Sequence, residues 1–338
     1  MKVRIMTDFT SVSKALLEGK NFVLTGHIMP DGDCLGSVLG LGIALQSIGK
    51  SVVMYSPDRA PGIYDFLPGG DQLVYDLNKE VEKNYDVLIA LDCSVEDRLG
   101  NLKGLLERSD KKVINIDHHA DNSRYGDYTY VDSTASATGE IIYNLLKFMD
   151  LEITEEVATC LYAAIMTDTD SFKYSNTSPE TLRVAADLME LGASAHHISN
   201  WVYGEKPLGN LKALRAALDT LEVSPCGYVS WVVINYKTHR ELGVCHEHTD
   251  GIVKTVRNIR QVEVGLLFRE TEPGKIKISL RSKFRVNVSA LAGHFGGGGH
   301  PRAAGCLIEG DLDKTVKNIV GAAVEAAGQR DPKDERGN

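Results

Sequence analysis

The sequence predicts an α/β fold: an N-terminal doubly wound, mostly parallel sheet, a helical linker, and a smaller C-terminal α/β domain. Three observations predict it. Short apolar runs rich in β-branched residues alternate with helical patterns over the first ~190 residues, as strands and crossover helices do. Beyond that point the pattern becomes richer in strands. The 338 residues also exceed one ordinary domain of about 100–200 residues and leave room for two.

The first part contains four expected strands and four expected helices. The strands are Phe22–Thr25, Ser51–Tyr55, Val87–Leu91 and Val113–Ile116. The helices are Cys34–Ile48, Ala137–Met149, Glu155–Thr167 and Pro179–Leu191. Sheets of this kind bind their ligands at the carboxyl ends of the parallel strands. A functional site is therefore expected at the edge where these strands end.

The chain is expected to divide into four segments. A first domain covers residues 1–192, and a helical linker covers residues 193–218. A second domain covers residues 219–329. The tail 330–338 is charged and contains glycine, so it is expected to be disordered.

The second domain is expected to contain at least three strands. They are Tyr228–Asn235, Val262–Glu270 and Lys275–Ser282. The last two are separated by Glu272, Pro273 and Gly274, which form a typical turn sequence, so these strands are predicted to pair as a hairpin.

The composition is that of a globular protein. Hydrophobic residues make up 43% and charged residues 25%, which excludes disordered and fibrous classes. No apolar run approaches the ~20 residues that a membrane helix needs, and the N-terminus lacks the apolar stretch of a signal peptide. The six cysteines lie far apart without a CxxC pair, which favours reduced thiols over a disulfide framework. We therefore predict a cytoplasmic protein that makes no membrane contact.

The charge is distributed unevenly along the chain. The net charge is −9, yet residues 211–302 contain 14 Lys and Arg against 8 Asp and Glu, so the remainder carries −15. An acidic part that gathers cations, followed by a more basic part that holds an anionic substrate, fits this distribution. Scattered surface charge is the alternative interpretation.

Acidic residues and histidines follow the predicted strands directly. They are His27, Asp31 and Asp33 after residues 22–25, Asp92 after 87–91, Asp117, His118 and His119 after 113–116, and Asp168 at the end of helix 155–167. Carboxylates that converge in this way repel one another unless cations lie between them. Imidazole and carboxylate without cysteine favour Mn²⁺ or Mg²⁺, with Fe²⁺ or Co²⁺ as further candidates, over structural zinc.

Each of these groups, taken alone, has an ordinary structural interpretation. His27 would be a surface histidine, Asp31-Gly32-Asp33 a turn, and Asp92 a helix cap. Neighbouring side chains on a strand point to opposite faces, so His118 and His119 need not bind the same ligand. Because all the groups follow the same edge of one sheet, a metal site is the favoured interpretation of the set.

A second motif is the glycine-rich segment Gly296–Gly305, which contains four consecutive glycines followed by His300. Glycine lets backbone N–H groups approach an oxyanion closely, and the guanidinium of Arg281 at an upstream strand end suits phosphate. Phosphate contact is favoured over a flexible linker because apolar segments flank the motif. For Asp132–Glu140, which opens a helix, two interpretations stay open: a helix cap, or hydroxyls and amides offered to a phosphate.

These motifs resemble those of the DHH phosphoesterase superfamily with its DHH-associated C-terminal domain. The resemblance runs from Phe22 to about Gly310. The four N-terminal motifs are matched in order by His27-x3-Asp31-x-Asp33, Asp92, Asp117-His118-His119 and Asp168. The arrangement is similar to the short two-domain members that act as bifunctional oligoribonucleases and pAp phosphatases.

The resemblance implies a role for each residue. One Mn²⁺ would be held by His27, Asp31 and Asp92, and a second by Asp33, Asp92, His118 and Asp168, with Asp92 as the bridge. Asp117 would orient an imidazole, and His119 would face the scissile phosphate. The terminal phosphate of the substrate would be held by Arg281, Gly297, Gly298, Gly299 and His300. Relatives often have glycine where this chain has Asp170, so this extra acid could perturb the site or point to solvent.

The implied activity is hydrolysis of very short RNA oligonucleotides or linear dinucleotides to mononucleotides, with pAp 3′-phosphatase as a further activity. Two Mn²⁺, replaceable by Mg²⁺ or Co²⁺, would activate a bridging water for in-line attack. The net charge of −9 argues against long duplex nucleic acid as a partner, and a homodimer is one candidate assembly. The alternatives are a soluble cyclic-dinucleotide phosphodiesterase, an inorganic pyrophosphatase of family II, and a nucleotide-binding regulator without turnover.

Overall fold

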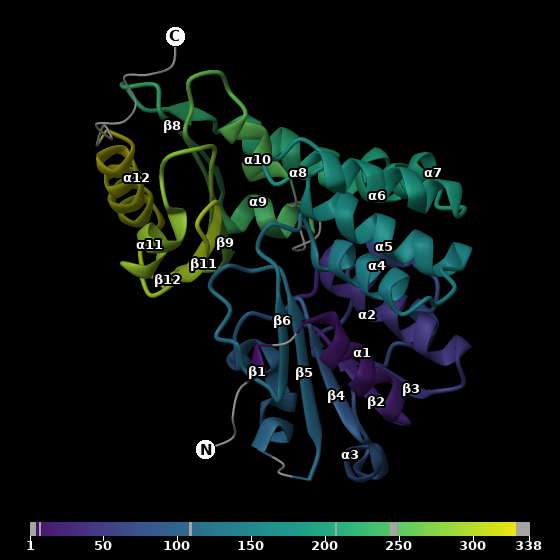
Figure 1. Cartoon of the computed structure of the whole chain (residues 1–338). Helices are drawn as coiled ribbons and strands as arrows, with labels where there is room; N and C mark the ends of the chain where they lie inside the picture. The colour runs from purple at the N-terminus through teal and green to yellow at the C-terminus, as the bar shows by residue number, and fades with distance from the viewer. Residues whose placement is uncertain are drawn as a thin grey trace. The chain divides into compact units, whose positions relative to one another are not determined.

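The computed structural model describes residues 5–6, 8–107, 110–206, 208–243, 249 and 251–328. The chain divides into two compact units, of which the first ends at Glu205 and the second begins at Lys206 (Figure 1). This boundary falls inside the expected linker, while the domain limits given above stay predictions. The tail 330–338, expected to be disordered, lies outside the described residues.

The first unit contains the predicted parallel sheet. Its strands run in the order β1-β6-β5-β4-β2-β3, and every neighbouring pair is parallel. The strands are β1 (Ile5–Met6), β2 (Asn21–Thr25), β3 (Ser51–Tyr55), β4 (Val87–Leu91), β5 (Lys112–Asp117) and β6 (Tyr128–Val131). The prediction of a parallel α/β sheet is confirmed. Sequence analysis missed β1 and β6, which are too short to show a strand pattern.

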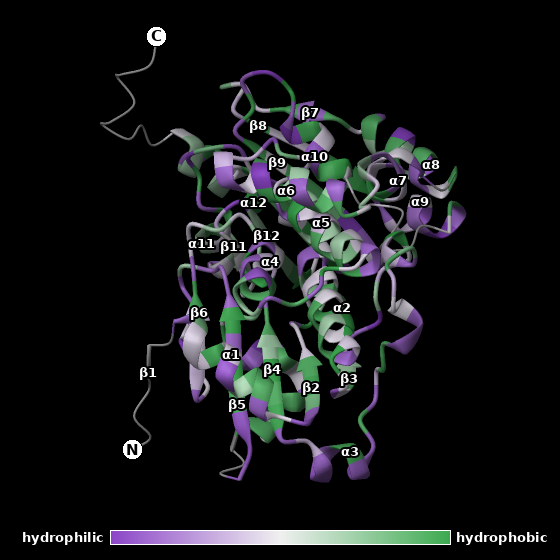
Figure 2. Cartoon of the chain, turned by 45° about the vertical axis from the view of Figure 1, so that its right-hand side comes forward, coloured by the Kyte–Doolittle hydropathy of each residue, from purple (hydrophilic) through white to green (hydrophobic). Residues whose placement is uncertain are grey.

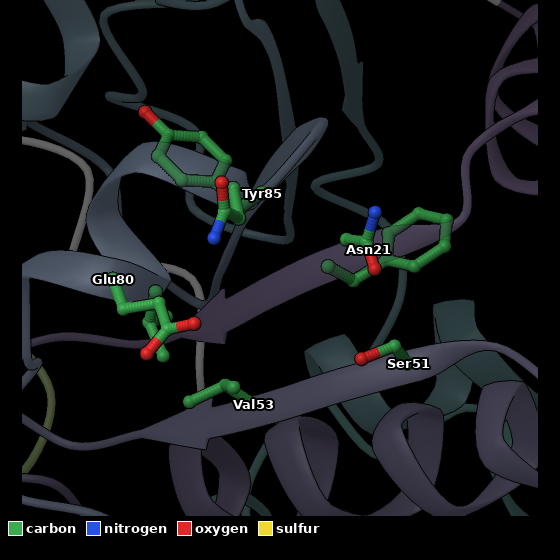
Figure 3. Close-up of a pocket in the computed structure, with 8 residues that line it drawn as sticks. Asn21, Ser51, Val53, Glu80 and Tyr85 are labelled. Carbon is green, nitrogen blue, oxygen red and sulfur yellow. The ribbon is translucent and has the colours of Figure 1, made fainter.

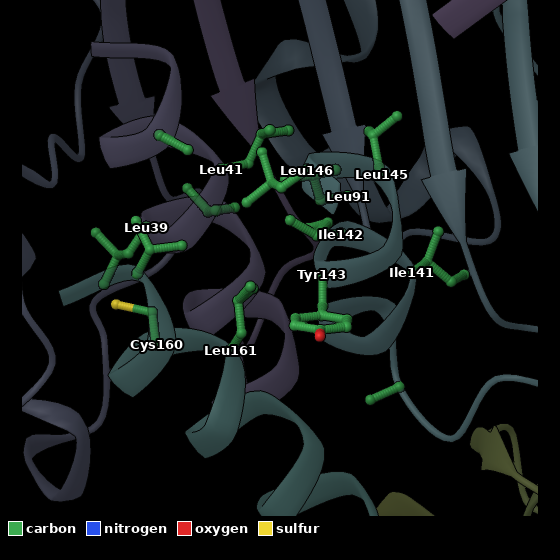
Figure 4. Close-up of a cluster of buried hydrophobic side chains, with 14 of the residues drawn as sticks. Leu39, Leu41, Leu91, Ile141, Ile142, Tyr143, Leu145, Leu146, Cys160 and Leu161 are labelled. Atoms are coloured by element: carbon green, nitrogen blue, oxygen red, sulfur yellow. The ribbon is translucent and has the colours of Figure 1, made fainter. Parts of the chain in front are cut away.

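Helices cover both faces of this sheet. Alternate residues of β4 point to opposite sides: Ile89 joins one buried cluster, and Leu88 joins another. The first cluster packs under α1 (Phe9–Glu18), α2 (Gly32–Ser47), α4 (Thr138–Phe148), α5 (Glu155–Asp168) and α6 (Pro179–Glu190) (Figure 4). The second lies under the 3₁₀ segment η3 (Glu96–Glu107). The central strand β4 is accordingly hydrophobic along its whole length and β2 over residues 22–24 (Figure 2), because both of their sides are buried.

Smaller elements complete the first unit. They are η1 (Gly62–Tyr64), η2 (Gly70–Gln72), α3 (Lys79–Asn84), α7 (Ala195–Ser199) and the π-turn η4 (Asn200–Gly204). The four predicted helices agree with α2, α4, α5 and α6 to within two residues at each end.

The second unit contains a mixed six-stranded sheet in the order β11-β12-β10-β9-β8-β7. Its strands are β7 (Glu222–Val223), β8 (Val229–Ile234), β9 (Val264–Glu272), β10 (Lys275–Ser282), β11 (Gly298–His300) and β12 (Ala303–Glu309). Its helices are α8 (Leu208–Leu218), α9 (Tyr236–Glu241), α10 (Ile252–Arg257), α11 (Val288–Gly293) and α12 (Leu312–Gly328). The predicted hairpin is confirmed, since β9 and β10 pair antiparallel.

Two further observations bear on the class of protein. Among the described helices, none has both the length and the apolar composition that crossing a bilayer requires. The five described cysteines, Cys34, Cys93, Cys160, Cys226 and Cys306, are free thiols.

Candidate metal centre

The first group of side chains lies around the loop that connects β2 to α2. His27 follows the strand and is buried, and its Nδ1 lies 2.7 Å from the carbonyl oxygen of Ile28. A carbonyl oxygen only accepts, so Nδ1 carries a proton, and Nε2 is the ring nitrogen that faces the carboxylates. Nε2 lies 3.4 Å from Asp92 Oδ2 and 3.8 Å from Oδ1 of Asp31, the N-cap residue of α2. These three side chains could hold one metal ion.

A second group forms around His118. Its Nε2 lies 3.6 Å from Asp92 Oδ1, 3.7 Å from Asp168 Oδ2 and 3.8 Å from Asp33 Oδ2. His118, Asp33 and Asp168 could hold another ion. Asp92 therefore turns one oxygen toward each group.

The backbone at Asp92 is unusual. This residue follows β4 with φ +52°, a conformation that few residues other than glycine adopt and that often marks a functional site. Its N–H donates to the carbonyl oxygen of Ile116 at 3.1 Å, which fixes the carboxylate beside the end of β5.

Asp33 is held by a helix that begins more than a hundred residues later. Its Oδ2 accepts a hydrogen bond of 2.7 Å from the N–H of Thr138, and its Oδ1 accepts from Gly139 N–H at 2.9 Å and from Ser37 Oγ at 3.1 Å. The hydroxyl of Thr138 donates to Asp92 Oδ1 at 3.2 Å. The start of α4 thus binds two carboxylates of the site through Thr138 and Gly139, an arrangement that neither interpretation of Asp132–Glu140 included. The N-cap residue of α4 is Ala137, whose methyl side chain cannot accept a capping hydrogen bond, and phosphate contact by this segment stays a prediction.

His119 belongs to a third arrangement. Its Nδ1 lies 2.7 Å from Asp117 Oδ1 and 3.5 Å from Asp92 Oδ1. Asp117 is fully buried and also accepts from the N–H of His118 and, at 2.6 Å, from Asn122 Nδ2. Asn122 in turn contacts Asn115 Oδ1 at 2.9 Å. Neither asparagine was predicted as part of the site, because Asn115 lies inside a strand and Asn122 in the loop after the histidine pair, and neither belongs to a motif.

Burial and mutual repulsion perturb two of the acids. Burial raises the pKa of Asp33 well above its usual value, and the neighbouring charges of Asp92 and Asp168 add to this. Burial also raises the pKa of Asp168 to about 7, although the charge of His118 opposes it. Both carboxyl groups thus hold a proton more readily than an ordinary aspartate does. A bound cation would offset the burial and the mutual repulsion that cause this.

Asp92 and His119 are shifted toward their ionised forms. Burial raises the pKa of Asp92, but the hydrogen bond to His27 and the nearby imidazoles outweigh it, so the pKa lies below its usual range. Burial lowers the pKa of His119, but the bond to Asp117 and the surrounding carboxylates outweigh it and raise the pKa to about 9. Buried oxygen and imidazole ligands around a shared aspartate are the donor set of a divalent-cation site, so these residues fit such ions.

Asp170 is not part of these groups among the described residues. Its Oδ2 lies 3.8 Å from Lys173 Nζ, and its backbone has φ +47°. Glycine adopts this conformation with less strain than aspartate does.

The residues expected to hold a substrate phosphate lie in the second unit. Arg281 lies on β10 opposite Ala303 of β12, and its Nη1 donates to the carbonyl oxygen of Leu280 at 2.9 Å. The segment Gly298–His300 forms strand β11 rather than a loop; the His300 side chain lies outside the described part of the chain. A Cβ at Gly297 would lie 2.2 Å from the carbonyl oxygen of Gly305, so close packing alone requires this glycine. Phosphate binding by these residues stays a prediction.

A pocket lies at the opposite edge of the first sheet. Asn21 and Ser51 begin β2 and β3, and they line it together with Glu80 and Tyr85 (Figure 3). Because the acids and histidines follow the other ends of the strands, this pocket is separate from the candidate metal centre.

Comparison with known proteins identifies the family. The sequence matches the N-terminal domain of the DHH family over residues 21–165 and the DHHA1 domain over residues 232–327. It is 32% identical over 327 residues to the bifunctional oligoribonuclease and PAP phosphatase NrnA of Thermus thermophilus, covering 96% of this chain and 94% of the relative. The chain belongs to the DHH family. The resemblance stated from the motifs is therefore confirmed.

Other relatives agree. This DHH protein is 29% identical to NrnA of Bacillus subtilis, over 85% of this chain and 88% of that protein. An exopolyphosphatase-related protein from Bacteroides fragilis superposes with a TM-score of 0.88 at 27% identity, covering 94% of this chain and 95% of that one. RecJ from Thermus thermophilus, solved with Mn²⁺, shares the fold at 13% identity and a TM-score of 0.56, over 98% of this chain and 56% of RecJ. The DHH protein described here is a phosphoric-ester hydrolase.

Proposed function

We propose that this protein hydrolyses very short RNA oligonucleotides and linear dinucleotides to mononucleotides, and removes the 3′ phosphate of pAp, with two Mn²⁺ ions. The observation that carries the proposal is the placement of Asp92, whose Oδ2 and Oδ1 lie 3.4 Å and 3.6 Å from the Nε2 atoms of His27 and His118. One carboxylate between two histidine–aspartate groups is suited to a pair of ions. The NrnA relatives are named as oligoribonucleases and PAP phosphatases, which supports the substrate class.

The ligands follow from the two groups. His27, Asp31 and Asp92 would hold one ion, and Asp33, Asp92, His118 and Asp168 the other. When bound, the ions would polarise the phosphoryl oxygens and lower the pKa of an attacking water. Mg²⁺ or Co²⁺ would substitute, because the same oxygen and nitrogen donors accept them.

In this proposal, His119 contacts the scissile phosphate and Asp117 orients the His119 ring. The Nδ1–H of His119 donates to Asp117 Oδ1 at 2.7 Å, which fixes the ring and leaves Nε2 for the substrate. In the metal-free protein, Asp117 and the surrounding carboxylates raise the pKa of His119 to about 9 against the effect of burial, and the hydrogen bond to Asp117 would favour the protonated ring with ions bound as well. An imidazolium would donate a hydrogen bond to a phosphoryl oxygen and stabilise the negative charge that grows there.

The second unit would supply the substrate anchor. Arg281, the backbone N–H groups of Gly297, Gly298 and Gly299, and His300 would hold a terminal phosphate. An anchored end favours short substrates. The proposal also includes a cytoplasmic location, in line with the free thiols of the described cysteines, and a homodimer as one assembly to be checked by light scattering.

The test is a product time course with MnCl₂ for pApA, a labelled five-residue RNA, pAp, cyclic di-AMP and pyrophosphate. Mononucleotides from pApA and the RNA, and AMP from pAp, are expected, and EDTA should stop all three reactions. Cleavage of cyclic di-AMP or pyrophosphate alone would overturn the substrate assignment in favour of the corresponding alternative. Nucleotide binding without release of any product would indicate a regulator instead.

A further inference from the structure

The side-chain amide of Asn176 lies against Asp168. Its Nδ2 donates to Asp168 Oδ2 at 3.4 Å, to the carbonyl oxygen of Asp168 at 3.3 Å and to that of Ser136 at 2.9 Å. All three partners are pure acceptors when the carboxylate is ionised, so only the NH₂ end of the amide can face them. The other end, Oδ1, is buried and has no hydrogen-bond partner among the described residues. The amide is thus oriented by its contacts with Asp168 and Ser136 alone.

The chain reaches this contact through a turn with a rare backbone conformation. After Asp168, three consecutive residues, Asp170, Ser171 and Phe172, have φ of +47°, +59° and +62°. Residues other than glycine adopt this left-handed conformation only at a cost in free energy. The turn is fixed by Thr169, whose carbonyl oxygen accepts from Lys173 N–H at 2.9 Å and whose Oγ1 accepts from Phe172 N–H at 3.0 Å. It reverses the chain after α5, so that Asn176 returns to the end of that helix.

Ser136, the other partner of Asn176, is itself fixed by hydrogen bonds to Glu140. Glu140 is buried, and its Oε2 accepts from Ser136 N–H at 3.1 Å, from Ser136 Oγ at 2.5 Å and from Thr181 Oγ1 at 2.9 Å. Ser136 comes two residues before Thr138, the residue whose N–H holds Asp33. Asn176 therefore ties the end of α5, with Asp168, to the segment that fixes Asp33.

We propose that Asn176 is a positioning residue for the second ion: it fixes the Asp168 carboxylate relative to Asp33 and His118, and Glu140 fixes the Ser136 end of this link. The inference rests on the proposed function in one respect, that Asp168 is taken as a ligand of that ion. Asn176 is not a catalytic residue in this role, because it acts on the substrate only through Asp168. Partners that orient a metal ligand typically change metal affinity by 10–100-fold when removed.

The test compares Asn176→Ala and Asn176→Asp with Thr177→Val in the full chain. Thr177 is the matched control, because its Oγ1 is also buried and has no hydrogen-bond partner among the described residues. Mn²⁺ binding to the metal-free protein is measured from the EPR signal of the free ion. We expect the Mn²⁺ affinity of one of the two sites to fall by about 10–100-fold in Asn176→Ala and by more in Asn176→Asp, while the affinity of the other site stays unchanged. Thr177→Val should bind Mn²⁺ at both sites as the wild type does.

Activity adds a second measurement. The kcat of Asn176→Ala on pApA should fall at low Mn²⁺ and recover as the Mn²⁺ concentration rises, with KM little changed. Unaltered Mn²⁺ affinity at both sites in Asn176→Ala and Asn176→Asp would overturn the inference, as would a lost activity that excess Mn²⁺ does not restore in a folded variant. A wild-type protein that binds two Mn²⁺ but cleaves none of the substrates would overturn the proposed function instead, and the comparison of Mn²⁺ affinities would still decide the role of Asn176.

Discussion

Asp92 Oδ1 lies 3.6 Å from His118 Nε2, while the other oxygen of the same carboxylate faces His27. The strand end that carries Asp92 has a left-handed backbone, and the Ile116 carbonyl oxygen holds its N–H. The carboxylate is therefore placed between two histidines from different strands rather than left free to rotate toward one of them.

Substitution of Asp92 is expected to separate metal binding from folding. Asp92→Asn keeps the size of the side chain but removes the charge shared by both groups, so the Mn²⁺ stoichiometry should fall below two and turnover of pApA should drop by at least about 100-fold. Mn²⁺ stoichiometry and the product time course measure the two effects. Asp86→Asn is the matched control, because Asp86 precedes the same strand at its other end and accepts from the N–H groups of Lys20 and Asn21. Near-normal turnover in Asp92→Asn would contradict the two-ion assignment.

The candidate ligands could be predicted from the sequence because each follows a strand or helix whose apolar pattern is strong. His27, Asp92 and His118 fall at the carboxyl ends of adjacent buried strands, and a parallel sheet brings those ends together whatever the loops do. The contacts that hold the ligands could not be predicted. Thr138 and Asp33 lie 105 residues apart, and no local pattern relates a helix start to a distant carboxylate.

Asn122 provides a test of the support behind His119. Its Nδ2 donates to Asp117 Oδ2 at 2.6 Å and to Asn115 Oδ1 at 2.9 Å, and both asparagines are buried. Asn122→Leu fills similar space but leaves the Asp117 carboxylate without this donor, which should cost about 1–3 kcal/mol of stability. The kcat should fall about 10-fold or more with little change in KM, because the His119 ring loses its fixed partner.

Thermal unfolding and steady-state kinetics of Asn122→Leu check both effects. Ser123→Ala is a suitable control, since Ser123 is the exposed neighbour of Asn122 and its hydroxyl donates to Glu96 Oε2 at 3.0 Å rather than to Asp117. If Asn122→Leu lowered stability but kept the wild-type kcat, the orienting role of Asp117 toward His119 would be wrong.

The stability of the metal-free protein should depend on pH because the buried carboxylates resist ionisation. Burial raises the pKa of Asp168 to about 7, so the folded chain holds a proton there that the unfolded chain, with an ordinary aspartate, releases near pH 4. This group therefore costs stability progressively as pH rises from about 4 through 7. Asp168→Asn, which cannot ionise, should melt above the wild type by a small margin at pH 5 and by a larger margin at pH 8.5, both in EDTA.

Mn²⁺ should reverse this order, because the ion binds the ionised carboxylate of the wild type and not the amide of the variant. Melting curves with and without MnCl₂ at the two pH values give the comparison. A variant that is less stable than the wild type at pH 8.5 in EDTA would show that Asp168 is not under electrostatic strain.

The fold was predictable to different degrees in the two units. Strand β4 is apolar along its whole length because both of its faces are buried, and β2, β3 and β5 each contain a shorter apolar run, so these strands can be recognised in the sequence. Strand β11 consists of Gly298, Gly299 and His300, and it exists because β12 offers it a backbone partner. A segment without apolar side chains carries no strand pattern, so no strand was predicted there.

Packing between α2 and α5 allows a prediction at one glycine. A Cβ added at Gly36 would lie 2.4 Å from the carbonyl oxygen of Cys160, and this backbone cannot move aside without shifting α5, the helix that ends in Asp168. Gly36→Ala should therefore lower stability by about 1–3 kcal/mol, although alanine in a helix interior ordinarily stabilises. Gly104→Ala is the matched control, because nothing lies within 4 Å of its added Cβ. Thermal unfolding in EDTA compares them, and a Gly36→Ala variant as stable as Gly104→Ala would show that α2 and α5 are not in close contact at this point.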